Sequence, residues 1–130
     1  MHKAIALLIA AGAVVAWAGS SAAADLKATL TGEGSGTATV SVDAAKPEVC
    51  YDLKLTGVAD PLAAHIHKGA AGASGPVAVP FAPPVNGASK GCAAVAKEVA
   101  EDLAANPAGY YVNVHTMANK AGAVRGQLSK

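Results

Sequence analysis

The sequence predicts an all-β domain, a Greek-key β-sandwich or barrel with one short helix. Three observations support this fold class. Short runs rich in β-branched residues recur along the chain, clusters of Gly and Pro separate them, and a single segment has helical spacing. No internal repeat or low-complexity tract competes with this interpretation.

The first residues are predicted to be a targeting signal. Lys3 is followed by an apolar run, residues 4–18, and then by small residues up to Ala24. This order is typical of a secretory signal peptide, here residues 1–24 with cleavage before Asp25. The apolar run is shorter than the roughly 20 residues that a membrane-spanning helix needs. We therefore expect a periplasmic or secreted protein without a stable membrane span, and an uncleaved segment that anchors the domain is the alternative.

Removal of this leader leaves residues 25–130, a length that suits one domain. The chain has ten Lys and Arg and nine Asp and Glu, and the leader contains Lys3 but no acid, so nine basic residues balance nine acidic ones. A balanced surface gives no electrostatic reason to expect nucleic acid or an anionic membrane as a partner.

The first half of the domain has the pattern of consecutive strands. Residues 26–31 and 37–43 are β-branched runs separated by a Gly-rich stretch, which predicts a hairpin. Residues 49–55 alternate apolar and polar side chains, which predicts a strand with one buried face.

The second half adds shorter elements. Residues 63–67 are a short extended run, and residues 76–81 are extended but contain an internal proline, which confines them to a sheet edge or a loop. Helical spacing predicts one short helix over residues 95–106. Residues 110–116 and 123–128 are two runs that predict a final hairpin with a longer loop.

The two cysteines, Cys50 and Cys92, predict a disulfide. An even number of cysteines in an exported chain most often pairs, and the bond would stabilise the fold by roughly 4 kcal/mol because the loop is long. A thiolate metal site is the alternative, although the C-x-x-C spacing of such sites is missing. Since Cys50 lies on the polar side of its strand, we expect the bond to hold the Pro/Gly-rich stretch before Cys92 against the outer face of the sheet.

Three stretches carry a resemblance to a known family: "CYDLKLTGV" from Cys50, "AHIHKGAAGASGPVAVP" from Ala64 and "PAGYYVNVHTMANKAGAVRGQL" from Pro107. Their order and combination resemble the CHRD domain, which is repeated in the developmental protein chordin and found singly in exported bacterial proteins. The resemblance covers nearly all of the domain. It implies an immunoglobulin-like β-sandwich in an extracellular or periplasmic setting, and it implies no settled biochemical activity. Chordin binds growth factors of the bone morphogenetic class, but the resemblance of a single domain does not imply that this chain binds them.

Alternation places the polar side chains of several strands on one side. His65 and His67 must point to the same face of their strand, and two imidazoles on one face are the simplest pair of metal ligands that a strand offers. If the last hairpin is a neighbour in the same sheet, its polar side joins them in a patch on the outer face. The candidate copper or zinc ligands are His65, His67 and His115, and the polar residues expected around them are Asp52, Tyr111, Asn113, Arg125 and Gln127.

Other interpretations of the histidines stay open. They could be hydrogen-bonding residues that pin the Gly-rich loop to the last hairpin, or part of a site for a small anion or ligand. A nearby cation such as Arg125 would oppose a bound metal ion. The H-x-H pair with a distant third histidine is similar to the copper–zinc superoxide dismutase family, but the chain lacks that family's bridging histidine and its second cluster with an Asp. Redox dismutation is therefore not expected.

The sequence thus predicts a non-enzymatic, exported binding or structural module of the CHRD type, with no catalytic residues. Its partner is expected to be a small ligand, a metal or an extracytoplasmic protein. The alternative function is a copper- or zinc-binding metalloprotein, including one with simple redox chemistry.

Overall fold

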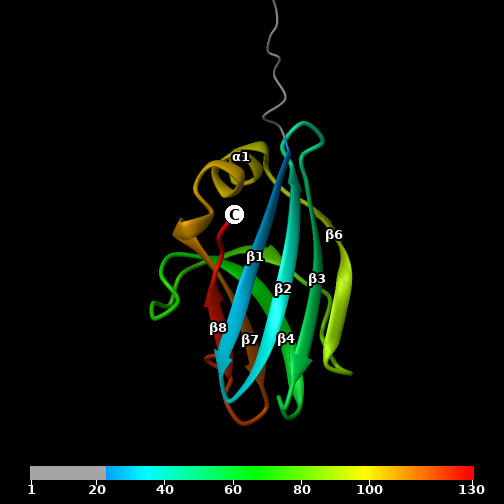
Figure 1. Ribbon diagram of the computed structural model, residues 1–130, viewed down its shortest axis with the longest axis vertical. Helices are drawn as coiled ribbons and strands as arrows, with labels where there is room; N and C mark the ends of the chain where they lie inside the picture. Colours follow the sequence, from blue (N-terminus) through cyan, green and yellow to red (C-terminus); the bar gives the residue numbers. More distant parts are fainter. Residues whose placement is uncertain (1–22) are drawn as a thin grey trace, which may run out of the picture.

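Eight strands form one antiparallel sheet in the computed structural model, which describes residues 23–130 (Figure 1). Their order across the sheet is β5-β4-β7-β8-β1-β2-β3-β6. The strands are β1 (Ala23–Gly32), β2 (Gly34–Asp43), β3 (Glu48–Thr56), β4 (Pro61–Lys68), β5 (Val77–Pro80), β6 (Ala88–Ala94), β7 (Tyr110–Thr116) and β8 (Val124–Gln127). Between β6 and β7 lie the helix α1 (Lys97–Ala105) and the short 3-10 turn η3 (Pro107–Gly109). The predicted signal peptide, residues 1–24, lies outside the described residues except for Ala23 and Ala24, which begin β1.

The predicted all-β fold class is confirmed, and every predicted strand is present within a few residues of its expected bounds. The first hairpin is tighter than the Gly-rich stretch predicted, because the β1–β2 ladder continues until Gly32 pairs with Gly34. Both glycines have positive φ, 140° and 117°, which a residue with a Cβ rarely adopts. Glu33 alone therefore makes the turn. The proline-containing strand β5 lies at one edge of the sheet, as expected.

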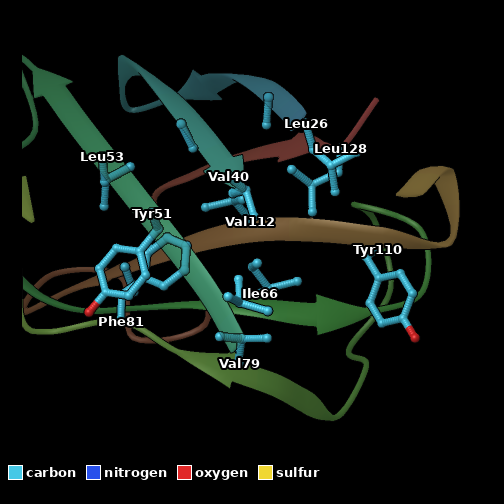
Figure 2. Close-up of a cluster of buried hydrophobic side chains, with 14 of the residues drawn as sticks. Leu26, Val40, Tyr51, Leu53, Ile66, Val79, Phe81, Tyr110, Val112 and Leu128 are labelled. Atoms are coloured by element: carbon cyan, nitrogen blue, oxygen red, sulfur yellow. The ribbon is translucent and has the colours of Figure 1, made fainter. Parts of the chain in front are cut away.

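The sheet curls until its two edges approach each other. Phe81, directly after the edge strand β5, stacks on Tyr51 of β3 with ring centroids 4.0 Å apart and ring planes 10° from parallel (Figure 2). The backbone N–H of Ala82 donates to the Tyr51 hydroxyl at 2.8 Å. Since β5 and β3 stand near opposite ends of the strand order, these contacts nearly close the sheet around one core.

Side chains from all parts of the sheet fill this core (Figure 2). Burying each large aliphatic side chain contributes roughly 1.5–3 kcal/mol. The largest apolar side chains that are fully buried are Leu30, Leu53, Ile66, Leu103, Leu128, Val40, Val42, Val49, Val79, Val112 and Val114.

Cys50 and Cys92 form the predicted disulfide. They are direct partners in the β3–β6 ladder, with Cα atoms 3.9 Å apart. The bond therefore joins the edge strand β6 to β3 within the sheet, and the expectation that it holds a loop against the outer face is wrong. The segment "ASKGCAA" was not predicted as a strand because it has no β-branched or aromatic side chain. Pairing with β3, rather than intrinsic preference, makes it one.

The helix α1 is shorter than the predicted span 95–106 because Ala96 is still extended, with φ −64° and ψ 146°. Its fully buried side chains are Ala100 and Leu103, and Val99 packs partly against the core. The helix lies at the end of the molecule where β1 begins (Figure 1). Within residues 23–130, no helix is long and apolar enough to cross a membrane.

Tyr110 links this helix to β7 through a hydrogen bond to Asp102. Its hydroxyl donates to Asp102 Oδ2 at 2.5 Å. Burial, then this hydrogen bond and the charge of Asp102, raise the pKa of Tyr110 to about 12.

An unfolded tyrosine ionises near pH 10, so the free energy of unfolding should fall as pH rises from about 10 through 12. Urea unfolding across this range will test it. In the Tyr110→Phe variant the part of this decrease that comes from ionisation of Tyr110 should be absent. If the free energy of unfolding of the variant decreases as steeply between pH 10 and 12 as that of the wild type, Tyr110 is not the cause.

Candidate metal centre

The β4–β7 ladder brings the predicted polar side chains together. His67 is the register partner of Tyr111, and His65 is the partner of Asn113. Paired residues of antiparallel strands point to the same side of a sheet, and residues two apart along a strand share a face. His115 therefore joins the same face as the two histidines of β4.

The three imidazoles converge there. The ring centroids of His65 and His67 are 5.4 Å apart, those of His65 and His115 are 5.0 Å apart, and those of His67 and His115 are 5.7 Å apart. One ring nitrogen from each histidine lies within 4.8 Å of one from each of the others. This is the only convergence of histidines within the described part of the chain.

Backbone carbonyls determine which nitrogen two of the rings present to this centre. His67 Nδ1 lies 2.9 Å from the Gly75 oxygen, and His115 Nδ1 lies 2.7 Å from the Lys120 oxygen. A carbonyl oxygen only accepts, so each Nδ1 carries the proton and each Nε2 keeps a lone pair. Donation from the second ring nitrogen to a carbonyl is the arrangement found around histidines that bind metals.

One nitrogen of each ring has no hydrogen-bond partner in the described part of the chain. His65 Nδ1, His67 Nε2 and His115 Nε2 are all buried, and no hydrogen-bonding atom of residues 23–130 pairs with them. Leaving one buried acceptor unsatisfied costs about 1–3 kcal/mol. Each of the three converging histidines thus has one buried ring nitrogen without a partner among the described residues. Such a set of imidazoles could hold a cation, and its chemistry suits copper or zinc.

His65 is kept neutral by its surroundings. Burial of the ring, then the charges of His115 and His67 when these are protonated, lower the pKa of His65 below 6.5. A neutral imidazole is the form that binds a metal ion.

The lowered pKa predicts that metal-free protein loses stability in mild acid. As pH falls below about 6.5, the unfolded chain takes up this proton before the folded protein does. The contribution of neutral His65 to the free energy of unfolding should therefore be fully present above pH 6.5, and it should be lost as pH falls from 6.5 through the lowered pKa of His65. Urea unfolding between pH 7.5 and 4.5 measures this, with His65→Gln as the comparison. Identical pH slopes in the two proteins would contradict it.

A Gly-rich loop, residues 69–76, covers the site and explains why part of the patch is buried. The Tyr111 hydroxyl donates to the Ala73 oxygen at 2.8 Å and accepts from the Gly75 N–H at 3.1 Å. The Tyr111 ring stacks on His67, with centroids 5.1 Å apart and planes at 10°. Tyr111 is 1% exposed and His67 is 7% exposed. The loop therefore buries these two members of the polar patch.

Arg125 and Gln127 hold the loops around the site. Arg125 Nη1 donates to the Ala71 oxygen at 2.7 Å, and Nη2 donates to the Ala121 oxygen at 3.0 Å. Gln127 accepts from the Ala71 N–H at 3.0 Å and donates to the Gly69 oxygen at 3.0 Å. The guanidinium charge is therefore engaged by two carbonyl oxygens, one from each loop beside the histidines.

Asn113 is 2% exposed and forms a hydrogen bond to the loop between β7 and β8. Its Nδ2 donates to the Ala121 oxygen at 3.0 Å. Asp52, by contrast, does not join the histidines. It lies on β3 between Thr39 and Lys90 and lines a separate surface hollow of about 470 Å³. Alternation indicated the correct side of its own strand, but β3 has β2 and β6 as neighbours.

Gly75 supplies the hydrogen-bond partner of His67, and the sequence analysis did not predict this role. A Cβ at this position would collide with the Lys68 carbonyl oxygen, so only glycine lets the loop return this close to β4. Its own oxygen then accepts from His67. The Gly-rich run was the one signal of this in the sequence, because a backbone carbonyl leaves no trace in residue identity.

We expect Gly75→Ala to damage both the loop and the site. Overpacking of this kind costs roughly 1–3 kcal/mol of unfolding free energy, and loss of an outer hydrogen-bond partner weakens metal affinity roughly 10- to 100-fold. Gly72→Ala is the matched control, because an added Cβ there meets nothing within 4 Å. Chemical denaturation and zinc titration of both variants test this, and equal effects in the two would refute the role given to Gly75.

Comparison with known proteins places this architecture in a family. The CHRD domain matches residues 18–128. No curated protein matches the chain, and no solved structure matches it. The match spans every strand described above and all three histidines. The β-rich domain with its converging imidazoles therefore belongs to the CHRD domain family.

Proposed function

We propose that the chain is an exported, non-enzymatic binding module whose ligand is a copper or zinc ion held by His65, His67 and His115. The observation that carries this proposal is that each of three converging histidines has one buried ring nitrogen without a partner in residues 23–130. The module is a CHRD domain, and its ligand is the part that we infer.

The ring nitrogens of the three histidines need to move only slightly closer together to bind one metal ion. Zinc binds imidazole nitrogen at about 2.0–2.1 Å, so ligands around a tetrahedral ion are about 3.3 Å apart. The nitrogens here lie within 4.8 Å of one another. Small shifts of the three side chains, with the Nδ1 hydrogen bonds of His67 and His115 kept, would bring the nitrogens to that separation. An all-imidazole set favours zinc or copper over magnesium or calcium, which prefer oxygen ligands.

A purely structural role explains the site less well. Two of the rings do pin loops, since His67 donates to Gly75 and His115 donates to Lys120. That role uses only one nitrogen of each ring. It leaves one buried nitrogen of each of the three histidines without a partner among the residues that the structure describes. Each such nitrogen costs about 1–3 kcal/mol of stability, whereas a bound cation would pair with all three.

The proposed setting is the periplasm or the cell exterior. The Cys50–Cys92 disulfide is typical of an oxidising compartment, and the N-terminal pattern predicts a cleavable signal. Mass spectrometry of secreted material would test the setting. A mature mass that begins at Asp25 supports it, and a retained leader argues for the anchored alternative.

Metal titration tests the function directly. Purified metal-free protein should bind one equivalent of Zn²⁺ or Cu²⁺ in isothermal titration calorimetry and in native mass spectrometry. His67→Ala should abolish this stoichiometric binding. Asp52→Ala is the matched control, because Asp52 lies outside the site and should bind as the wild type does. Absence of binding, or binding that survives loss of all three histidines, would overturn the proposal.

A further inference from the structure

The three imidazoles are held unequally. His67 and His115 each donate Nδ1–H to a backbone oxygen, of Gly75 and Lys120 respectively. His65 has no such anchor, since no hydrogen bond within residues 23–130 holds its ring and its Nδ1 has no partner. His65 and His115 are both half-buried, whereas His67 is 7% exposed, so it is the missing hydrogen bond and not exposure that sets His65 apart. Hydrogen bonds to the backbone therefore hold two of the ligands, and no such bond from the described residues holds the third.

The anchors themselves are tied down. The Gly75 oxygen belongs to the loop between β4 and β5, and the Lys120 oxygen belongs to the loop between β7 and β8. Arg125 donates to both loops, to Ala71 at 2.7 Å and to Ala121 at 3.0 Å. Displacing His67 or His115 from a metal would therefore require breaking hydrogen bonds in a connected network, and displacing His65 would not.

We propose that His65 is the exchangeable ligand, and that the metal enters and leaves the site by replacement of His65 with a donor from outside. This inference rests on the proposed function. One bond between His65 and the metal breaks as one bond from the incoming donor forms. The oxidation state does not change, and no proton moves when the incoming donor is a neutral imidazole. The metal stays attached to His67 and His115 until the acceptor has replaced His65. Further donors of the acceptor then replace His67 and His115, and each metal–nitrogen bond breaks as a bond to the acceptor forms, so the ion is not released free.

A site of this kind suits transfer of a metal rather than permanent storage. The acceptor is recognised by its chemistry: a protein or small molecule that presents an imidazole or another nitrogen donor to the His65 side of the site. His67 and His115 are then holding ligands, and Arg125 is a positioning residue that acts through the two loops.

Ligand-exchange kinetics test the inference. Protein loaded with one equivalent of Zn²⁺ is mixed at pH 7.5 with the zinc indicator 4-(2-pyridylazo)resorcinol, which is both competitor and reporter. Exchange through His65 predicts that the observed rate of zinc loss rises linearly with indicator concentration. A rate that does not depend on indicator concentration would show that the ion leaves on its own, and would overturn the inference.

Equilibrium affinities of the variants give an independent test. His67→Ala removes a ligand together with its outer hydrogen bond, which alone is worth roughly 10- to 100-fold in affinity. We therefore expect His67→Ala and His115→Ala to weaken zinc binding by at least that factor more than His65→Ala does. His65→Asn serves as a second variant that keeps a polar side chain, if the alanine variant does not fold.

The outcomes separate this inference from the function on which it rests. Wild-type protein that binds no zinc in the titration defeats the proposed function before any kinetics are measured. Wild-type protein that binds zinc, combined with a His65→Ala variant as weak as His67→Ala, defeats only the inference about exchange.

Discussion

Addition of Zn²⁺ or Cu²⁺ to the metal-free protein at pH 7.5 will raise Tm by about 10 °C or more when free metal exceeds its Kd a hundredfold. A ligand that binds only the folded state adds about 2.7 kcal/mol at that excess. One kcal/mol shifts the Tm of a domain of this size by about 4–8 °C. Differential scanning calorimetry with and without metal measures the shift, and a chelator should reverse it.

The shift should depend on pH and on each histidine. Imidazole must be neutral to bind a metal, and its usual pKa is about 6.5. At pH 5 protons therefore compete with the metal, and the rise in Tm should be much smaller. His115→Ala should lose most of the effect at pH 7.5. An equal shift at both pH values, or one that survives three His→Ala substitutions, would place the bound metal elsewhere on the surface.

Removal of the disulfide will have the largest effect on the fold itself. The Cys50→Ala and Cys92→Ala double variant should unfold with about 4 kcal/mol less free energy, because the bond closes a long loop in the unfolded chain. The two cysteines are 42 positions apart. The loss corresponds to a fall in Tm of roughly 15 °C or more. Urea unfolding of the oxidised wild type and the double variant measures it.

A reduced wild-type sample provides the control for that experiment. It should resemble the double variant, because both lack the bond between β3 and β6 while keeping the ladder of backbone pairs. The folded double variant should still bind one equivalent of zinc, since the histidines lie on β4 and β7. A loss of less than about 1 kcal/mol would show that the bond adds little to the closed sheet.

The convergence of the histidines was predictable because side chains alternate along a strand. His65 and His67 had to share a face, and so did Asn113 and His115. Nothing in the pattern states which strands are neighbours, however. The assumption that the polar strands adjoin one another was right for β4, β7 and β8, and it was wrong for Asp52 on β3.

Other features were hidden because they depend on tertiary contacts. The strand β6 has the composition of a loop and becomes a strand through its pairing with β3. The carbonyl oxygens that orient His67 and His115 belong to Gly75 and Lys120, and any residue type carries such an oxygen. The burial of Tyr111 required knowledge of how the Gly-rich loop folds back over its own strand.

The pairing of β4 with β7 also determines when the site can exist. Strands β1, β2 and β3 pair with their neighbours along the chain, so this meander can assemble from local contacts. His65 and its partner Asn113, by contrast, are separated by about fifty positions, and contacts of that range form slowly because a long loop must first be closed. The three imidazoles meet only after this long-range ladder has formed. Metal would therefore be acquired by an already folded domain, and a chain that meets the ion while still unfolded would have no assembled centre with which to capture it.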